Sequence, residues 1–175
     1  MGFFVTRPDD NTKFVNHGVN VSDFAVRDDI GHEKVDRIFI KAMSVAIQSK
    51  DPLKKVGAII IDNGDFSTLS DGYNGMPFGT RDSDRVWEKN NKKSLVVHAE
   101  LNAIILARRD LRNSILVATL KPCNACASAI VQAGIKEVWY PYKEYKSGDK
   151  YDMADVIFNN ARTHVIAERI ELVYK

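Results

Sequence analysis

Four residues in the middle of the chain carry side chains that could do chemistry. His98 and Glu100 are separated by one alanine, and Cys123 and Cys126 follow within the stretch P-C-N-A-C. One imidazole and two thiolates suit a tetrahedral zinc ion, and three protein ligands leave a fourth position open to water. A zinc ion with an open position is typical of catalysis. The spacing therefore predicts a catalytic zinc centre formed by His98, Cys123 and Cys126.

Glu100 is not needed to complete this ligand set, so it is available to move protons between the activated water and a substrate. The alternatives are a redox dithiol for the two cysteines and a surface carboxylate for Glu100. The order of one histidine, one glutamate and two cysteines favours catalytic zinc over both. A purely structural zinc site is disfavoured, because structural sites close all four positions.

Two helices are expected to position these side chains. The stretch from His98 to Arg109 is apolar nearly all round and predicts a buried helix. Small residues dominate Cys123 to Ala133, and Gly134 is a suitable residue to end that second helix. Helix N-termini at His98 and Cys123 would aim their N–H groups at the metal and favour thiolate over thiol.

The rest of the chain alternates between predicted helices and strands. An amphipathic helix is expected over 33–49, and strands over 56–61 and 66–73 are expected to form an antiparallel hairpin with Asn63-Gly64 at its turn. The segment from about 74 to 93 is expected to be a long loop.

The second half of the chain completes the predicted sheet. Strands over 114–120 and 137–140 flank the second helix, which favours a parallel crossover. A further helix is expected around 154–161. The chain is expected to close with one alternating strand whose inward residues are Ile166, Ile170 and Leu172. The sum is a three-layer α/β fold, with helices on both faces of a mixed sheet of about five strands.

Composition favours one soluble domain that acts on a small molecule. The chain has 175 residues, of which 45% are hydrophobic and 27% charged, and its net charge is +2. The basic cluster at 89–93 is too short for a polynucleotide track, so neither nucleic acid nor a membrane is expected as a partner. Two cysteines at ligand spacing, without a secretory or membrane-spanning stretch, predict a cytoplasmic protein.

Six sequence blocks resemble the deoxycytidylate (dCMP) deaminase family. The zinc motif alone fits the whole cytidine deaminase superfamily, and the S-K-D-P and G-Y-N-G-M-P blocks narrow the resemblance to dCMP deaminases. The resemblance covers residues 28–175, which we interpret as the deaminase domain. Residues 1–27 remain as an extension of unknown role. The blocks are S-K-D-P (49–52), V-G-A (56–58), G-Y-N-G-M-P (72–77), H-A-E-L-N-A-I (98–104), P-C-N-A-C (122–126) and Q-A-G-I-K-E-V (132–138).

The resemblance implies the cytidine-deaminase-like fold and the hydrolysis of dCMP to dUMP, the precursor of dTMP, with release of ammonia. Zn²⁺ would lower the pKa of a water molecule, and Glu100 would act first as base and then as acid. The resemblance also implies a homohexamer that dCTP activates and dTTP inhibits, with Mg²⁺ accompanying the triphosphate.

The resemblance further implies two sets of binding residues. Asn74 matches the position that binds the deoxyribose, and Ala99 is expected to offer its backbone to the base. The candidates for the 5′-phosphate are Ser49, Lys50, Lys55 and Tyr145. The candidates for effector binding are Gly75, Met76, Phe78 and Asn102.

Two further functions remain as alternatives. One is a deaminase for a free nucleoside or a tRNA adenosine, although the first would not need Lys50 and Tyr145 and the second would need a more basic surface. The other is a nucleotide-sensing zinc protein without catalysis. Glu100 argues against a sensor, because sensing requires no proton carrier.

Overall fold

The computed structural model describes residues 3–6, 30–81, 83–142, 153–168 and 171–174. A five-stranded sheet lies at its centre, with β2 antiparallel to both β3 and β4, while β4, β5 and β6 run parallel. This confirms the mixed sheet and the parallel crossover. In spatial order the strands are β3 (Thr68–Tyr73), β2 (Gly57–Asp62), β4 (Ser114–Ala118), β5 (Glu137–Pro141) and β6 (His164–Glu168).

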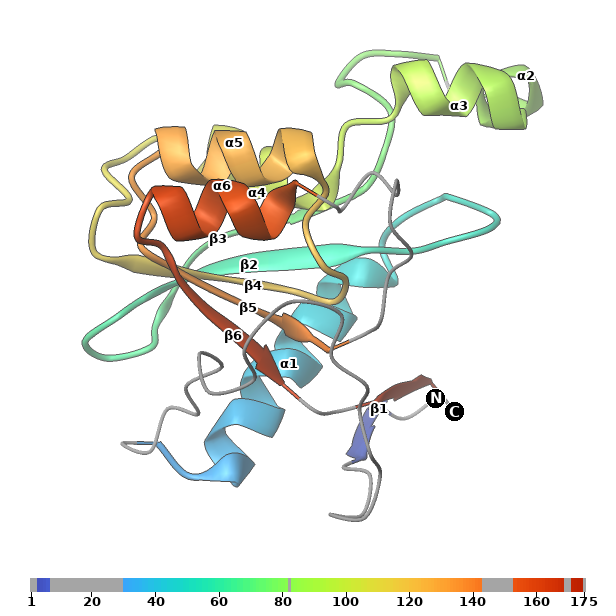
Figure 1. Ribbon diagram of the computed structural model, residues 1–175. Coiled ribbons are helices and arrows are strands. Elements are labelled where there is room, and N and C mark those ends of the chain that lie inside the picture. The colour runs from blue at the N-terminus through green and yellow to red at the C-terminus, as the bar shows by residue number, and fades with distance from the viewer. Residues whose placement is uncertain (1–2, 7–29, 82, 143–152, 169–170, 175) are drawn as a thin grey trace.

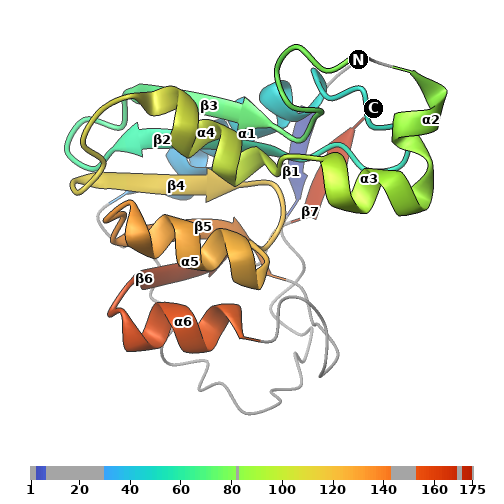
Figure 2. The same ribbon diagram turned by 90° about the horizontal axis from the view of Figure 1, so that it is seen from above.

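Helices cover both faces of this sheet, which confirms the predicted three layers. Helix α1 (His32–Ala46) lies along one face (Figure 1). On the other face lie α4 (Ala99–Ala107), α5 (Asn124–Gln132) and α6 (Ala154–Asn160), side by side in the view from above (Figure 2). Within the described part of the chain, no helix is long and apolar enough to cross a membrane.

The hydrophobic core is divided by the sheet. On the α1 face, Phe39, Ile59 and Trp139 belong to one buried cluster, and on the opposite face Ile60 and Phe158 belong to another. Because successive residues of a strand point to opposite faces, a strand between two helical layers must be apolar on both. The buried run of β2, from Gly57 to Ile61, meets this requirement.

Two glycines allow helices to approach the sheet closely. A Cβ atom at Gly72 would lie 2.4 Å from the backbone nitrogen of Ala103, and one at Gly57 would lie 2.2 Å from the carbonyl oxygen of Ala42. Neither distance can accommodate a side chain. Gly72 thus lets α4, the helix that carries Glu100, lie directly against β3.

The β2–β3 hairpin forms as predicted, but its turn differs. The left-handed backbone conformation within it belongs to Phe66, at φ 63°, rather than to Asn63 or Gly64. The Asp62 carboxylate instead accepts hydrogen bonds from the backbone nitrogens of Gly64 at 2.7 Å and Asp65 at 3.3 Å. This Asx-type turn lengthens the connection, and β3 begins two residues later than predicted.

The segment predicted as one long loop contains two short helices. They are α2 (Asp84–Trp87) and α3 (Lys89–Leu95), and they stand apart from the three layers at the upper right of Figure 1. The prediction of a structureless loop was therefore wrong. Neither helix is long enough to show a clear apolar period, so the sequence pattern gave no signal for them.

Helix α4 is not buried all round, contrary to the prediction. Ala99, Glu100 and Ala103 are buried, whereas Leu101, Ile105 and Leu106 are 36%, 59% and 56% exposed. Only the small-residue side of the helix packs on the sheet. An apolar surface is left on its outer side.

The closing segment forms two strands where one was predicted. Ile166 is buried in β6, while Leu172 belongs to β7 (Glu171–Tyr174) and Ile170 lies outside the described residues. Strand β7 pairs antiparallel with β1 (Phe3–Thr6) in a separate two-stranded sheet. Leu172 and Val5 pack against the core on the α1 face, so the two ends of the chain contribute to the same layer.

Candidate metal centre and substrate cavity

The three predicted zinc ligands meet where α4 and α5 begin. His98 is the N-cap of α4, Cys123 is the N-cap of α5, and Cys126 lies in the first turn of α5. The His98 Nδ1 atom lies 3.3 Å from the Cys126 sulfur and 3.4 Å from the Cys123 sulfur. The structure thus brings together residues that lie up to 28 positions apart in the chain.

The spacing of these atoms suits zinc. For tetrahedral bonds of about 2.3 Å to sulfur and about 2.0 Å to nitrogen, the nitrogen and sulfur ligands lie about 3.6 Å apart. The observed separations are close to that value, and all three ligand atoms lie within 4.8 Å of one another. Among the residues described, no other group of three histidine, cysteine or acidic side chains is arranged to hold a metal ion.

The two cysteines influence each other's pKa. The Cys126 thiol donates to Cys123, and this bond, with a smaller contribution from His98, lowers the pKa of Cys123 to about 3. The same hydrogen bond, together with burial, raises the pKa of Cys126. Both cysteines are buried and free of disulfide bonds. The lowered pKa of Cys123 favours its thiolate, the form that ligates a metal.

Glu100 lies beside the ligands with its side chain enclosed. It is 4% exposed, and burial raises the pKa of its carboxyl above the usual range. It lines the same cavity as His98 and Cys123. A raised pKa makes the carboxyl group a better proton acceptor than an exposed glutamate, as a general acid–base catalyst requires.

A cavity of about 580 Å³ opens from this centre. That volume is within the range of roughly 300–1,000 Å³ typical of small-molecule sites. The lining combines metal ligands and an acid with several basic side chains. The lining comprises the metal end (His98, Ala99, Glu100, Cys123), apolar walls (Val56, Val96, Leu120), two polar residues (Asp51, Asn74) and four lysines (Lys54, Lys92, Lys93, Lys121).

Asn74 is held in one orientation within the cavity wall. Its amide nitrogen donates to Asp51 Oδ2 and to the carbonyl oxygen of Lys54, both at 2.9 Å. Its amide oxygen accepts from the backbone nitrogen of Val56 at 2.7 Å. Both donor hydrogens are therefore used, and an amide oxygen retains a second acceptor position for a ligand.

Asp51 is the centre of this polar network. Its side chain is fully buried, and Lys92 Nζ from α3 lies 2.5 Å from its Oδ2 atom. Burial by itself would raise the pKa of Asp51, but hydrogen bonds from Lys92 and from the backbone of Leu53 and Lys54 lower it overall. The carboxylate thus stays ionised and joins α3 to the loop that precedes β2.

The phosphate candidates expected from the S-K-D-P region make other contacts. The Ser49 hydroxyl donates to the carbonyl oxygen of Asn74 at 2.7 Å, and Lys55 Nζ donates to the carbonyl oxygens of Ser49 and Ile47 at 2.5 and 3.3 Å. Ser49, Lys50 and Lys55 all lie in the described part of the chain and do not line the cavity. Tyr145 lies outside the described residues.

Four lysines that no motif identified do line the cavity. Lys92 and Lys93 belong to the basic cluster that sequence reasoning dismissed as too short for nucleic acid. That cluster was the only available signal, because lysine is ordinarily a surface residue and its position depends on the fold.

The effector candidates lie outside the cavity. Gly75 forms an antiparallel bridge with Val97, through backbone hydrogen bonds of 3.1 and 2.9 Å, directly before His98. The Asn102 amide of α4 donates to the carbonyl oxygen of Tyr73 at 2.8 Å. Phe78 is fully exposed and Met76 is partly buried. The structure therefore places Gly75 beside the start of α4 and Asn102 on that helix.

Comparison with known proteins agrees with this geometry. Residues 31–141 match the family model of the cytidine and deoxycytidylate deaminase zinc-binding region. Human deoxycytidylate deaminase is 40% identical over 123 residues, which cover 66% of this chain and 68% of the human one. The deoxycytidylate deaminase of enterobacteria phage T4 is 29% identical over 160 residues, covering 66% and 82% of the two chains.

Solved structures resemble the fold as well. The dCMP deaminase of cyanophage S-TIM5, in complex with dCMP and dUMP, superposes with a TM-score of 0.64 at 28% identity. The match covers 78% of this chain and 97% of the cyanophage chain. The structure of the same cyanophage enzyme in its apo form gives a TM-score of 0.61. These matches confirm the predicted fold class.

Proposed function

Because the chain belongs to the cytidine and deoxycytidylate deaminase family, we propose that it hydrolyses dCMP to dUMP and ammonia with the help of zinc. The observation that carries this proposal is the position of Glu100, buried beside one histidine and two cysteines in the wall of an open cavity. Lysines line the same cavity, as a substrate with a base and a phosphate would require.

His98, Cys123 and Cys126 would hold the metal. When bound by three protein ligands, zinc supplies a Lewis acid that lowers the pKa of a water molecule. Glu100 accepts a proton from the attacking water and delivers it to ring nitrogen N3 of cytosine, while the water oxygen bonds to ring carbon C4. Glu100 then carries the second water proton to the exocyclic nitrogen. The C4–N bond breaks, ammonia leaves, and C4 becomes the carbonyl carbon of uracil.

Asn74 and Ala99 would orient the nucleotide. Ala99 lies between His98 and Glu100 and lines the cavity, where its backbone can contact the base. Since both Asn74 amide hydrogens are already donated within the protein, its contact with the deoxyribose is made by the amide oxygen, which accepts from the sugar hydroxyl. Ser49 and Lys55 support this arrangement by holding backbone carbonyls of the same loops.

The same family membership motivates a proposal for regulation. We propose that dCTP, accompanied by Mg²⁺, activates the enzyme and that dTTP inhibits it, through Gly75, Met76, Phe78 and Asn102. The hydrogen bonds between Gly75 and Val97 support a coupling route, because a shift of this loop would move the residue that precedes the ligand His98.

We further propose that the chain assembles as a homohexamer in the cytoplasm. The exposed apolar side of α4, with Leu101, Ile105 and Leu106, supports association, since exposed apolar clusters commonly mark protein interfaces. Two free cysteines placed as metal ligands suit a reducing compartment.

The function is tested by following ultraviolet absorbance with dCMP, CMP, deoxycytidine and dCTP as separate substrates of the zinc-loaded protein. We expect kcat/KM for dCMP to exceed that for deoxycytidine by at least about tenfold, because deoxycytidine has no phosphate for the lysines of the cavity to bind. We also expect kcat/KM for dCMP to exceed the values for CMP, which has an additional 2′-hydroxyl, and for dCTP, whose triphosphate is larger. Added dCTP with Mg²⁺ should raise the dCMP rate and dTTP should lower it. If dCMP remains unchanged although one zinc ion is bound per chain, the protein is a nucleotide sensor instead.

A further inference from the structure

We infer that α3 is the phosphate-recognition element of this enzyme, with Lys93 and Lys54 binding the 5′-phosphate and Lys92 positioning α3 through Asp51. The inference rests on the proposed function and deepens it. It assigns the nucleotide specificity to a segment in which the sequence shows no motif. We call Lys54, Lys92 and Lys93 the lysine clamp.

The clamp lies next to the residue proposed to hold the sugar. Asp51 Oδ2 accepts a hydrogen bond from the Asn74 amide at 2.9 Å and pairs with Lys92 Nζ at 2.5 Å. The Asn74 amide also donates to the carbonyl oxygen of Lys54 at 2.9 Å. Asn74 is therefore bonded directly to the backbone of Lys54 and is linked to α3 through Asp51. A phosphate on the 5′ carbon of a sugar held by Asn74 lies only a few bonds from that contact.

Charge explains why three lysines are needed. The buried Asp51 carboxylate would repel a phosphate dianion if it were left alone, and the Lys92 ammonium offsets that charge. Lys92 is thus engaged with Asp51, and Lys54 and Lys93 bring further positive charge to the cavity lining. Lys121 also lines the cavity, and its ammonium pairs with Asp155 of α6 at 2.6 Å.

The ion pair also fixes the position of α3. Helices α2 and α3 stand apart from the sheet layers, so few core contacts hold them (Figure 1). The Lys92 side chain is 19% exposed and reaches a carboxylate whose side chain is fully buried. Lys93, the next residue along α3, is presented to the cavity by this attachment. Lys92 is accordingly a positioning residue, whereas Lys93 and Lys54 contact the substrate.

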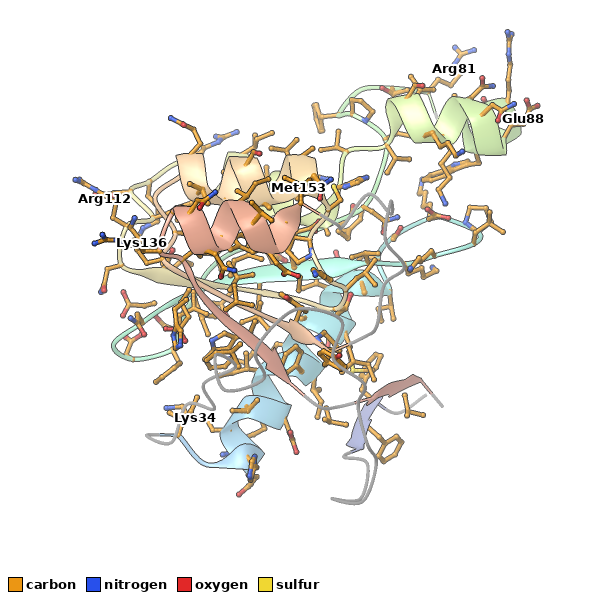
Figure 3. The ribbon with its side chains drawn as sticks, in the orientation of Figure 1. Lys34, Arg81, Glu88, Arg112, Lys136 and Met153 are labelled. Carbon is orange, nitrogen blue, oxygen red and sulfur yellow. The ribbon has the colours of Figure 1, made fainter. Side chains whose placement is uncertain are left out.

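The experiment compares kcat/KM for dCMP and for deoxycytidine, which lacks the phosphate, in single variants of the full-length, zinc-loaded protein. Lys93→Gln and Lys54→Gln should each lower kcat/KM for dCMP by about tenfold or more, the effect of losing one charge-assisted hydrogen bond, while kcat/KM for deoxycytidine changes less than about twofold. The control is Lys136→Gln, which lies at the opposite end of the molecule from α3 and should leave both values unchanged (Figure 3).

Lys92 requires its own comparison. Lys92→Gln should lower kcat/KM for dCMP more than for deoxycytidine, because Asp51 is then left uncompensated near the phosphate, and Lys92→Arg should restore most of the loss. If Lys92 acted only in folding, Lys92→Gln would lower kcat/KM for dCMP and for deoxycytidine by the same factor. The inference would be overturned if the ratio of kcat/KM for dCMP to kcat/KM for deoxycytidine stayed at the wild-type value in Lys92→Gln, Lys93→Gln and Lys54→Gln. If Lys50→Gln instead lowered kcat/KM for dCMP but not for deoxycytidine, the phosphate would bind beside the S-K-D-P segment.

A binding measurement separates failure of the clamp from failure of the proposed function. If the wild-type protein turns over neither substrate, the proposed function fails, and calorimetric titration with dUMP and deoxyuridine then tests the clamp. The clamp is supported even then if the wild-type protein binds dUMP more tightly than deoxyuridine and Lys93→Gln binds the two with equal affinity. Equal affinities of the wild-type protein for dUMP and deoxyuridine would refute it.

Discussion

At the scale of single residues, the chemistry depends on two groups with opposite requirements. A ligand cysteine needs a low pKa, and the interaction with Cys126 lowers the pKa of Cys123. Glu100 needs a pKa high enough to carry a proton, and burial supplies it. Both conditions arise within one turn of two helix N-termini. The proton carrier and the metal ligands are therefore distinct in role although they are adjacent in space.

Glu100→Gln is expected to separate these roles. The amide cannot accept the water proton, so turnover of dCMP should fall by roughly 10²–10⁴-fold or more, the usual contribution of a general acid–base group. Zinc content should stay at the wild-type level, because Glu100 is not a ligand. Initial rates and metal analysis by mass spectrometry on the same preparation check both points. A near-normal rate in this variant would exclude Glu100 as the proton carrier.

The sequence revealed some of these residues and not others. His98, Cys123 and Cys126 could be predicted because few residue types ligate zinc and their spacing restricts the choice. Lys92 and Lys93 could not, because a lysine gains a specific role only when the fold brings it to a cavity. Asn74 was identified as a sugar contact, but its free acceptor position became evident only from the hydrogen bonds around Asp51.

At the scale of elements, α4 has two apolar sides with different partners. Its small residues pack on the sheet, where Gly72 leaves no room for a side chain, while Ile105 and Leu106 are more than half exposed. Hydrophobic pattern alone predicted a helix buried all round, since a pattern records polarity but not which side finds a partner within the same chain. The exposed side is where we expect a second copy of the chain to bind.

Ile105→Lys tests this expectation. A lysine in an apolar interface should weaken assembly, so size-exclusion chromatography with light scattering should show smaller species than the wild type at the same concentration. The matched control is Val156→Lys on α6, a residue 43% exposed on the same helical layer, which should leave the assembly intact. A wild-type protein that is monomeric, or an Ile105→Lys variant of unchanged mass, would contradict assembly through α4.

At the scale of the whole molecule, the centre links the two halves of the fold. His98 belongs to the helix after the β2–β3 hairpin, and both cysteines belong to the helix between the parallel strands β4 and β5. The element types and the five-stranded sheet could be predicted because each long element has its own periodicity. The pairing of β1 with β7 could not, because the two strands lie at opposite ends of the chain and no local pattern reports such contacts.

Zinc dependence is tested most directly by measuring metal content and dCMP turnover in one sample before chelation, after chelation and after zinc is restored. We predict one zinc ion per chain at the start, loss of turnover in proportion to zinc removed, and recovery of both when zinc returns. Turnover of dCMP that persists at the starting rate after zinc has been removed would contradict the assignment of His98, Cys123 and Cys126 as a catalytic metal centre.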